Sequence, residues 1–416
     1  MPLRTDSYCI RNFWSLSCSL LVLVLFVSIT HAQEPARGEP DASTIDSTAS
    51  STTPQHQRRK LIEWAAVEPT TAFMREHIRT MEQLPFDGLI FHLKTDEDVQ
   101  MVWNMWSDTP FTIDQFSRAI ADLKATSFER FTERFLRCNV TPGNIDWTDN
   151  DGWEVVAGNF RTAAQIVHRT GCRGIMFDTE QYVNLPFSWP PQTPEERDAA
   201  AARRADSRNT DSQSDIEPAT VPPEIAAIVR QRGREWIRAI NAECPDITIL
   251  ISYAYRAAQP TDGESFRLYG YELIPAFLDG VLEAASDSTR IVDAWEYSYP
   301  YRSRAEFEKA RRTMKEDAIH WTSVPDEYTQ HVTAGFGLWM DFDVRGHEWH
   351  PENVSLNYNT PGQFRKNLDD AFELTDEYVW IYTGQAKWWT DVKLPEEYRK
   401  AVEESRTAAR KPNAVD

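Results

Sequence analysis

The feature that most restricts the fold is a regular alternation of short apolar runs with longer amphipathic segments. The apolar runs predict eight strands: Leu61–Trp64, Gly88–Leu93, Phe135–Val140, Gly174–Asp178, Thr248–Tyr253, Arg290–Glu296, Gly335–Asp341 and Tyr378–Tyr382. The amphipathic segments predict the helices that follow: Thr71–Gln83, Thr112–Lys124, Trp153–Arg169, Pro223–Ala242, Phe266–Ala285, Ser303–Glu316, Gln363–Leu374 and Pro395–Ala408. Eight such units are typical of a single closed (β/α)8, or TIM, barrel. A doubly wound open sheet is the alternative, but no glycine-rich phosphate loop follows the first strand to favour it.

The segments outside this alternation define the domain organisation. Residues 1–32 read as a signal peptide, with Arg4 and Arg11 before an apolar core at Leu20–Val27 and a small residue, Ala32, at the cleavage site. An uncleaved N-terminal anchor is the alternative. Residues 33–57 are rich in Ser, Thr, Pro and Ala and predict a disordered linker. The barrel is expected over residues 58–412, with residues 190–222 as a low-complexity loop insertion after the fourth strand. We therefore expect a secreted or periplasmic protein.

The cysteines allow at most one disulfide within the barrel. The chain has 5 Cys, and two of them fall within the signal peptide. Cys138, Cys172 and Cys244 remain, and the last two each precede a predicted strand. A Cys172–Cys244 bridge at the amino ends of neighbouring strands is one interpretation. Two buried thiols are the other, because free cysteine packs like a small hydrophobe.

The charge balance restricts the partners. The 64 acidic and 44 basic residues give a net charge of -20, which argues against nucleic acid and anionic membranes because both require clustered Lys and Arg. No apolar run after the signal peptide is long enough to span a bilayer. The strand ends lack the His and Cys clusters that a transition metal requires, so no metal and no cofactor is expected.

Carboxylates and aromatic residues gather at the predicted carboxyl ends of the strands, where barrels place their functional sites. The clearest case is the fourth strand, whose apolar run ends in Asp178, Glu180, Gln181 and Tyr182. The candidate catalytic carboxylates are Asp178, Glu180, Glu296 and Asp341. The candidate substrate-binding residues are Trp64, His92, Asn139, Gln181, Tyr182, Tyr253, Tyr255, Trp295, Tyr297, Trp339, Tyr382 and Trp389.

Paired carboxylates beside aromatic rings suit the cleavage of glycosidic bonds in a polysaccharide or oligosaccharide. One protonated carboxyl donates to the leaving oxygen, and a second meets the positive charge that develops at the anomeric carbon. Glu180 is expected to be the general acid/base because the charge on Asp178 raises its pKa. Glu296 or Asp341 is expected to be the second carboxylate. Each of these acids also has a structural alternative as a helix cap or an ion-pair partner, and Asp341 with Asp343 as ligands of a structural cation.

Two short stretches resemble a known family. Gly174-Ile-Met-Phe-Asp178-Thr-Glu180 resembles the fourth-strand signature of family 18 chitinases, and Gly335-Phe-Gly-Leu-Trp339-Met-Asp341 resembles their glycine-rich strand with a Trp at the pocket floor. The resemblance implies that Glu180 is the acid and that Asp178 orients the substrate. Arg173 and Met176 stand where that signature has further aspartates. More broadly, the chain resembles secreted (β/α)8 glycoside hydrolases, many of which place the nucleophile on strand seven, which favours Asp341.

Two other functions fit parts of the sequence. A non-catalytic carbohydrate-binding barrel would use the same aromatic residues without a working carboxylate pair. A metal-dependent hydrolase is suggested by His347-Glu348-Trp349-His350, because two His three residues apart can bind zinc. A solvated loop is the other interpretation of that stretch, which lacks an obvious third ligand.

Overall fold

The computed structural model describes residues 59–191, 220–259, 270–342 and 349–410. The predicted signal peptide, the linker at 33–57 and most of the insertion at 190–222 therefore lie outside the described residues. Within them, no helix combines the length and the apolar composition that crossing a bilayer requires.

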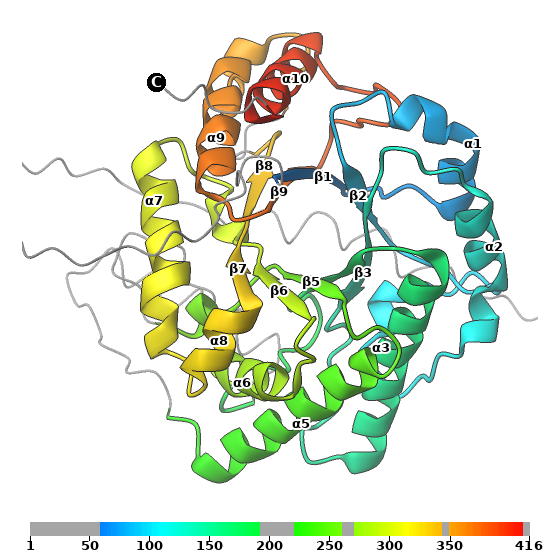
Figure 1. Ribbon diagram of the computed structural model, residues 1–416, viewed down its shortest axis with the longest axis vertical. Helices are drawn as coiled ribbons and strands as arrows, with labels where there is room; N and C mark the ends of the chain where they lie inside the picture. Colours follow the sequence, from blue (N-terminus) through cyan, green and yellow to red (C-terminus); the bar gives the residue numbers. More distant parts are fainter. Residues whose placement is uncertain (1–58, 192–219, 260–269, 343–348, 411–416) are drawn as a thin grey trace, which may run out of the picture.

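The strands form one parallel sheet that closes into a barrel (Figure 1). Its strands are β1 (Lys60–Ala65), β2 (Gly88–Phe91), β3 (Glu133–Asn139), β4 (Gly174–Asp178), β5 (Thr248–Ile251), β6 (Arg290–Asp293), β7 (Val332–Ala334), β8 (Phe336–Trp339) and β9 (Tyr378–Thr383). Pairing runs in sequence order from β1 to β7, and β9 pairs with both β1 and β8.

The barrel closes at Gly335, which separates β7 from β8. β7 pairs with β6 and β8 pairs with β9, so one extended segment completes the ring as its seventh strand. The backbone N–H of Gly335 donates to the Asp293 carbonyl at 2.8 Å. A side chain at this position would meet Val292 at 2.8 Å, so the close approach of the strands requires glycine. The predicted (β/α)8 barrel is confirmed.

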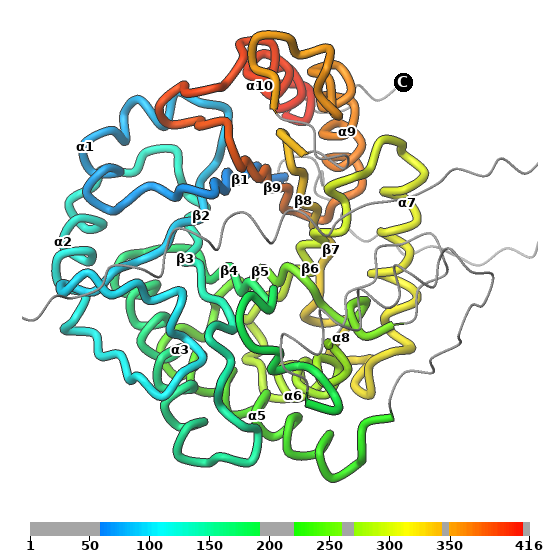
Figure 2. Tube along the Cα trace, turned by 180° about the vertical axis from the view of Figure 1, so that it is seen from behind, coloured from blue at the N-terminus to red at the C-terminus, as the bar shows by residue number. Residues whose placement is uncertain are grey.

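Helices surround the ring on all sides (Figures 1 and 2). They are α1 (Thr71–Met81), α2 (Ser117–Ala125), α3 (Asn150–Thr170), α5 (Pro223–Asn241), α6 (Ile274–Ala284), α7 (Arg304–Arg312), α8 (Pro325–His331), α9 (Pro361–Leu374) and α10 (Glu396–Arg410). Two differences from the prediction stand out. α6 begins at Ile274 rather than Phe266, which lies outside the described residues, and the short helix α8 precedes β7 where no helix was expected.

Alternation along each strand separates two apolar cores, as a pleated strand requires. One face of the strands packs against the helices. The other fills the barrel interior with Ile62, Trp64, Ile90, Phe135, Met176, Leu250, Val292, Ala294, Tyr378 and Trp380. The amino end of the interior is closed by Glu133, which pairs with Lys60 at 3.0 Å and accepts from the Tyr378 hydroxyl at 2.9 Å. The opposite end of the interior carries the polar residues described below.

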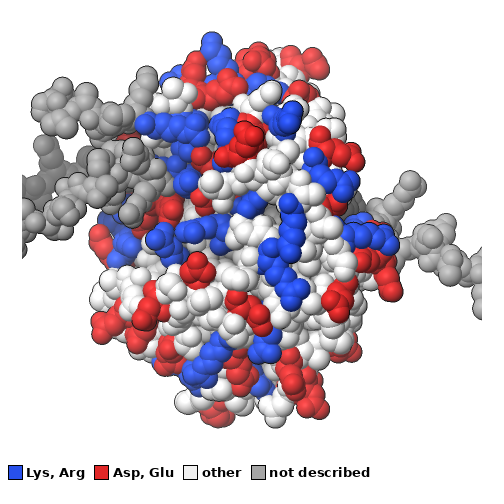
Figure 3. Space-filling model, turned by 45° about the vertical axis from the view of Figure 1, so that its right-hand side comes forward, with Lys and Arg blue, Asp and Glu red and all other residues white. Residues whose placement is uncertain are grey.

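The three cysteines of the barrel all lie within the described residues. Cys138, Cys172 and Cys244 are all free thiols, so the Cys172–Cys244 disulfide interpretation is wrong. Cys244 is buried, as the other interpretation requires, whereas Cys172 is only partly buried. On the face shown in Figure 3, acidic and basic side chains are interspersed, without a large patch of either sign.

Candidate active site

Asp178, the last residue of β4, is held by a buried arginine from the neighbouring strand. Arg137 of β3 donates to Asp178 Oδ2 from Nη2 at 2.7 Å and from Nε at 3.2 Å, and the Tyr182 hydroxyl donates to the same oxygen at 3.1 Å. The other oxygen accepts the backbone N–H of Glu180 at 3.1 Å. Asp178 is fully buried, so these donors are what compensates its charge. It is therefore a charged neighbour of Glu180 rather than a free acid.

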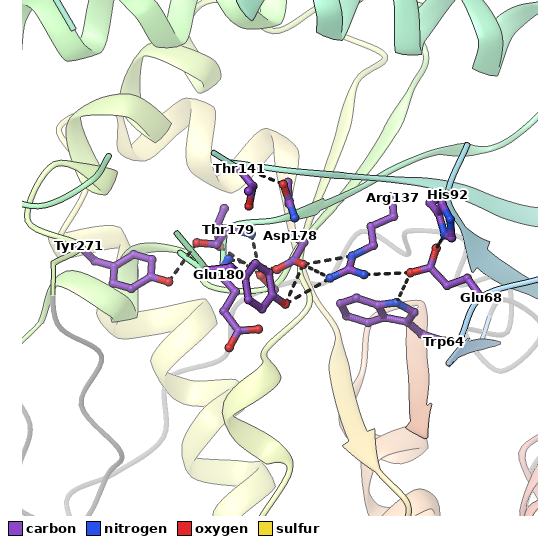
Figure 4. A network of polar contacts seen from close by, with 12 residues as sticks. Trp64, Glu68, His92, Arg137, Thr141, Asp178, Thr179, Glu180 and Tyr271 are labelled. Carbon is purple, nitrogen blue, oxygen red and sulfur yellow. Dashed lines mark hydrogen bonds and ion pairs between the residues drawn. The ribbon is translucent and has the colours of Figure 1, made fainter. Parts of the chain in front are cut away.

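The loop after β1 supplies a second carboxylate to Arg137, which the sequence analysis missed. Glu68 accepts from Arg137 Nη1 at 3.0 Å and from the Trp64 indole at 3.1 Å, and its other oxygen lies 2.8 Å from His92 Nδ1 (Figure 4). Burial alone raises the pKa of Glu68, but the hydrogen bond from His92 and the charge of Arg137 outweigh it and hold that pKa below its ordinary value. No pattern marks Glu68 in the sequence, because it lies in a loop between Val67 and Pro69.

Glu180 leaves the β4 strand at an angle to Asp178. Thr179 is fixed to β5 through Ser252 and the Tyr253 carbonyl, and Figure 4 shows the Glu180 carboxylate directed away from Arg137. The side chain is partly exposed. Burial raises the pKa of Glu180 to about 7, and the negative charge of Asp178 adds to the increase.

Glu296 approaches Glu180 from the end of β6. It begins a short turn, Glu296–Ser298, immediately after Trp295, whose φ of 37° lies in the left-handed region that a bulky side chain rarely adopts. Glu296 is 7% exposed, and its Oε2 has no hydrogen-bond partner among the described residues. Burial raises the pKa of Glu296 well above its ordinary value, and the charges on Glu180 and Asp178 raise it further. The two glutamates therefore share one electrostatic environment.

Aromatic residues surround this pair. Burial raises the pKa of Tyr253, Tyr271 and Tyr299, and the charges of both glutamates raise each of them further, which places these hydroxyls near the pair. Tyr382 of β9 contacts Trp64 and Trp339 at ring-centroid distances of 5.4 and 5.1 Å. Three further pairs of rings are in contact, with these distances between ring centroids: Tyr297 and Tyr253 at 5.1 Å, Trp339 and Tyr299 at 5.4 Å, and Trp103 and Tyr182 at 5.3 Å. Tyr271, Tyr299 and Trp103 were not predicted as site residues. Tyr271 falls within the predicted helix Phe266–Ala285 but precedes α6 in the structure, and Trp103 lies in the short 3-10 helix Val102–Asn104.

Asn139 also belongs to this end of the barrel. It lies opposite Asp178 in the β3–β4 register and is fully buried. Its Oδ1 accepts the backbone N–H of Thr141 at 2.8 Å, whereas Nδ2 has no partner among the described residues. A buried amide whose NH2 group has no acceptor is unusual. Such a group can donate a hydrogen bond to an oxygen of a ligand.

Asp341 has a structural role rather than the predicted catalytic one. Its Oδ1 accepts from the Trp339 indole at 2.7 Å and the Gly384 N–H at 2.8 Å. Its Oδ2 accepts the backbone N–H of Gln385 at 2.5 Å and of Ala386 at 2.9 Å. Four donors occupy both oxygens, so Asp341 fixes the turn after β9 and has no free lone pair directed at Glu180. The alternative of a cation bound with Asp343 is not tested, because Asp343 lies outside the described residues.

Four predicted substrate-binding residues are placed away from the pair. The Gln181 amide bonds the Gly270 carbonyl and the Phe187 N–H, so both its ends are used by the backbone. Tyr255 donates to Asp279 of α6 at 2.8 Å. Trp295 donates to the Tyr301 hydroxyl at 3.0 Å on the outer side of β6, and Trp389 packs against Phe86 at 5.7 Å. These four residues stabilise loops and helices behind the strands.

The described residues contain no group of three or more His, Cys, Asp or Glu side chains arranged to hold a metal ion. His347 and Glu348 of the proposed zinc-binding stretch lie outside the described residues, so that alternative is not tested.

No protein-family model and no curated protein matches the sequence. Solved barrels of similar architecture include an exo-β-1,4-mannosidase from Opitutaceae bacterium strain TAV5, with 13% identity and a TM-score of 0.47 over 86% of this chain and 61% of that one. A GH5_18 protein from Streptomyces cattleya has 14% identity and a TM-score of 0.43 over 83% and 76% of the two chains. A broad-specificity GH5-4 endoglucanase from Clostridium acetobutylicum has 10% identity and a TM-score of 0.43 over 85% and 100%. The chain thus spans 61% of the mannosidase it matches. The likeness concerns the barrel architecture, and the resemblance to family 18 chitinases is not shown by these matches.

Proposed function

We propose that this protein is a glycoside hydrolase that cleaves a polysaccharide or oligosaccharide with Glu180 and Glu296. One observation carries the proposal. Two carboxyls follow strands β4 and β6 at the carboxyl end of the barrel. Burial raises the pKa of both, the charge of Asp178 adds to each increase, and the charge of Glu180 raises that of Glu296 further. A pair in which one carboxyl loses its proton before the other passes through a state with a single proton, which is the protonation state that two-carboxylate hydrolysis requires.

Burial and surroundings suggest which member holds the proton. Glu296 is the more buried of the two, and one of its oxygens has no donor among the described residues. The charge of Arg137 favours the ionised form of Glu180, against burial and the charge of Asp178. We therefore assign the proton to Glu296, which donates it to the glycosidic oxygen. Ionised Glu180 then meets the positive charge at the anomeric carbon, by direct attack or by activating a water molecule. This is the reverse of the roles expected from the sequence.

The surrounding residues suit the same reaction. The partly exposed rings of Tyr299, Trp339 and Tyr382 offer flat apolar faces for sugar rings, and the free amide donor of Asn139 suits a sugar hydroxyl. Secretion or export to the periplasm is part of the proposal and rests on residues 1–32. A glycan is the only partner that the proposal requires.

Reducing-end release from neutral oligosaccharides and polysaccharides of varied linkage tests the proposal. We expect hydrolysis of at least one of them by the wild-type chain, and a loss of about 10³-fold or more in Glu180→Gln and in Glu296→Gln. Glu133→Gln is the matched control, because Glu133 is a buried carboxylate at the other end of the barrel. Full activity in either site variant would remove that residue from the mechanism.

A non-catalytic carbohydrate-binding barrel is the second candidate. It is favoured by the raised pKa of both carboxyls, since a carboxyl that stays neutral cannot act as a nucleophile or base. Glycan binding in calorimetry at pH 8, without product release from the same glycan, would establish this function instead.

A further inference from the structure

Glu68 occupies an unusual position for a loop residue. Its side chain is 1% exposed, although no regular element holds it. Each of its carboxylate oxygens faces the functional end of the barrel, one toward Arg137 and Trp64 and the other toward His92 (Figure 4). An acid is buried in this way only when its charge is fully compensated.

Arg137 connects this acid to the proposed catalytic pair. Its guanidinium spans Glu68 on one side, at 3.0 Å, and Asp178 on the other, at 2.7 Å. The guanidinium carbon also lies 4.9 Å from the centre of the Trp64 ring and 5.3 Å from that of Trp103. Asp178 in turn accepts the backbone N–H of Glu180. A continuous set of direct contacts therefore runs from Glu68 to the backbone of Glu180.

We propose that Glu68 is a positioning residue of the active site, which anchors Arg137 and thereby fixes the orientation and the charge of Asp178 beside Glu180. Arg137 is shared between Glu68 and Asp178, and the negative charge of Glu68 offsets part of its positive charge. The effect of Arg137 on the catalytic pair is therefore weaker than it would be without Glu68. Without Glu68, the same guanidinium would bind Asp178 alone. The role of Glu180 in this proposal rests on the proposed function, whereas the anchoring of Arg137 does not.

The charged and titratable groups around Arg137 all enter this balance. Glu68 and His92 approach from the loops after β1 and β2, Asp178, Glu180 and Tyr182 from the end of β4, and Glu296 from the end of β6. Glu63 lies on the outer face of β1, and the charge of Glu68 adds to the effect of burial in raising its pKa. Replacing Glu68 by Gln removes one negative charge from this set and substitutes none of its other members.

The test is the titration of Glu180 by NMR in the full chain carrying ¹³C-labelled glutamate carboxyls, with the resonance assigned by its loss in Glu180→Gln. In Glu68→Gln we expect the midpoint to fall by at least about half a pH unit, because the charge of Arg137 is less compensated. Glu133→Gln is the matched control, since Glu133 is also buried and bound by a cation and by hydroxyl donors but lies at the amino end of the barrel. The control should leave the midpoint unchanged.

A midpoint in Glu68→Gln that equals the wild-type value, or that moves no further than in the control, would overturn the proposal. Should Glu68→Gln fail to fold, Glu68→Asp replaces it, because the shorter side chain keeps the charge but withdraws it from Arg137; it must then lower the midpoint by a smaller amount. The titration needs no substrate. A shifted midpoint in a protein that hydrolyses no glycan would support the anchor and refute the proposed function, so the two failures are distinguishable.

Discussion

Burial and the charge on Glu180 together raise the pKa of Glu296, although β5 separates the two strands that carry these residues. In a parallel barrel, next-nearest strands lie about 10 Å apart, since neighbouring strands are spaced by about 4.8 Å. Side chains that converge from the carboxyl ends of β4 and β6 can bridge this distance. Two acids that follow these strands can therefore act on the same bond.

Removing the charge of Asp178 is expected to shift the pH dependence of hydrolysis. The active form carries one proton on the pair, so kcat/KM against pH should be bell-shaped. Asp178 raises the pKa of both Glu180 and Glu296 by its negative charge, after the larger effect of burial. Asp178→Asn should therefore move both limbs of the profile to lower pH. An unchanged or upward-shifted profile would show that Asp178 does not act on the pair.

Glu296→Gln should stabilise the protein at alkaline pH. Because the folded-state pKa of Glu296 is raised, mainly by burial, the favourable contribution of the neutral carboxyl is complete below the unfolded value near 4.5 and is lost as the pH rises through the folded value. The amide stays neutral throughout. Thermal unfolding at pH 8 should give a melting temperature about 1–2 °C above wild type, which corresponds to about 1 kcal/mol in a barrel of this size. The difference should vanish near pH 4. A lower melting temperature at pH 8 would mean that Glu296 is ionised and well compensated.

Asp341→Asn should reduce stability far more than catalysis. The asparagine keeps one acceptor oxygen for the donors on the turn after β9 and directs an NH2 group at the remaining N–H groups. We expect a loss of about 2–4 kcal/mol in the free energy of unfolding by urea, with kcat/KM within about tenfold of wild type where the variant is folded. Normal stability with turnover as low as in Glu180→Gln would instead restore Asp341 as a catalytic residue.

The contact between α5 and α6 should tolerate no side chain at its two glycines. A Cβ on Gly233 would lie 2.1 Å from the Phe277 carbonyl oxygen, and one on Gly280 would lie 1.9 Å from that of Arg230. Gly233→Ala should therefore destabilise the fold by about 1–3 kcal/mol or more. Gly158→Ala in α3 is the matched control, because nothing lies within 4 Å of its Cβ, and it should stabilise by about 0.5–1 kcal/mol. Equal melting temperatures for the two variants would contradict the close packing.

The barrel was predictable because each strand is buried on both faces and appears as a short apolar run between helical segments. Helix α8 was missed because it has only 7 residues and buries only Tyr328 and His331. The break at Gly335 was read as the start of a strand, since a glycine gives no indication that the preceding three residues pair with β6.

The candidate site was predictable only in part. Asp178, Glu180 and Glu296 follow from the rule that barrels act at the carboxyl ends of their strands. Trp295 was predicted to bind substrate. Ala294 lies in the barrel interior, so the alternation of side chains along β6 directs Trp295 away from the interior and toward the helices. The contacts of Asp341 with residues 384–386 and of Glu68 with Arg137 join residues far apart in sequence, and no local pattern predicts them.

The most direct measurement is the ¹³C carboxyl titration of Glu180 in the wild-type chain and in Glu296→Gln. If the two acids share one proton, Glu180 should titrate in two steps in the wild type, because its resonance also senses the ionisation of Glu296, and in one step in the variant. Identical single-step curves in both proteins would show that the carboxyls are independent and would contradict the shared-proton pair.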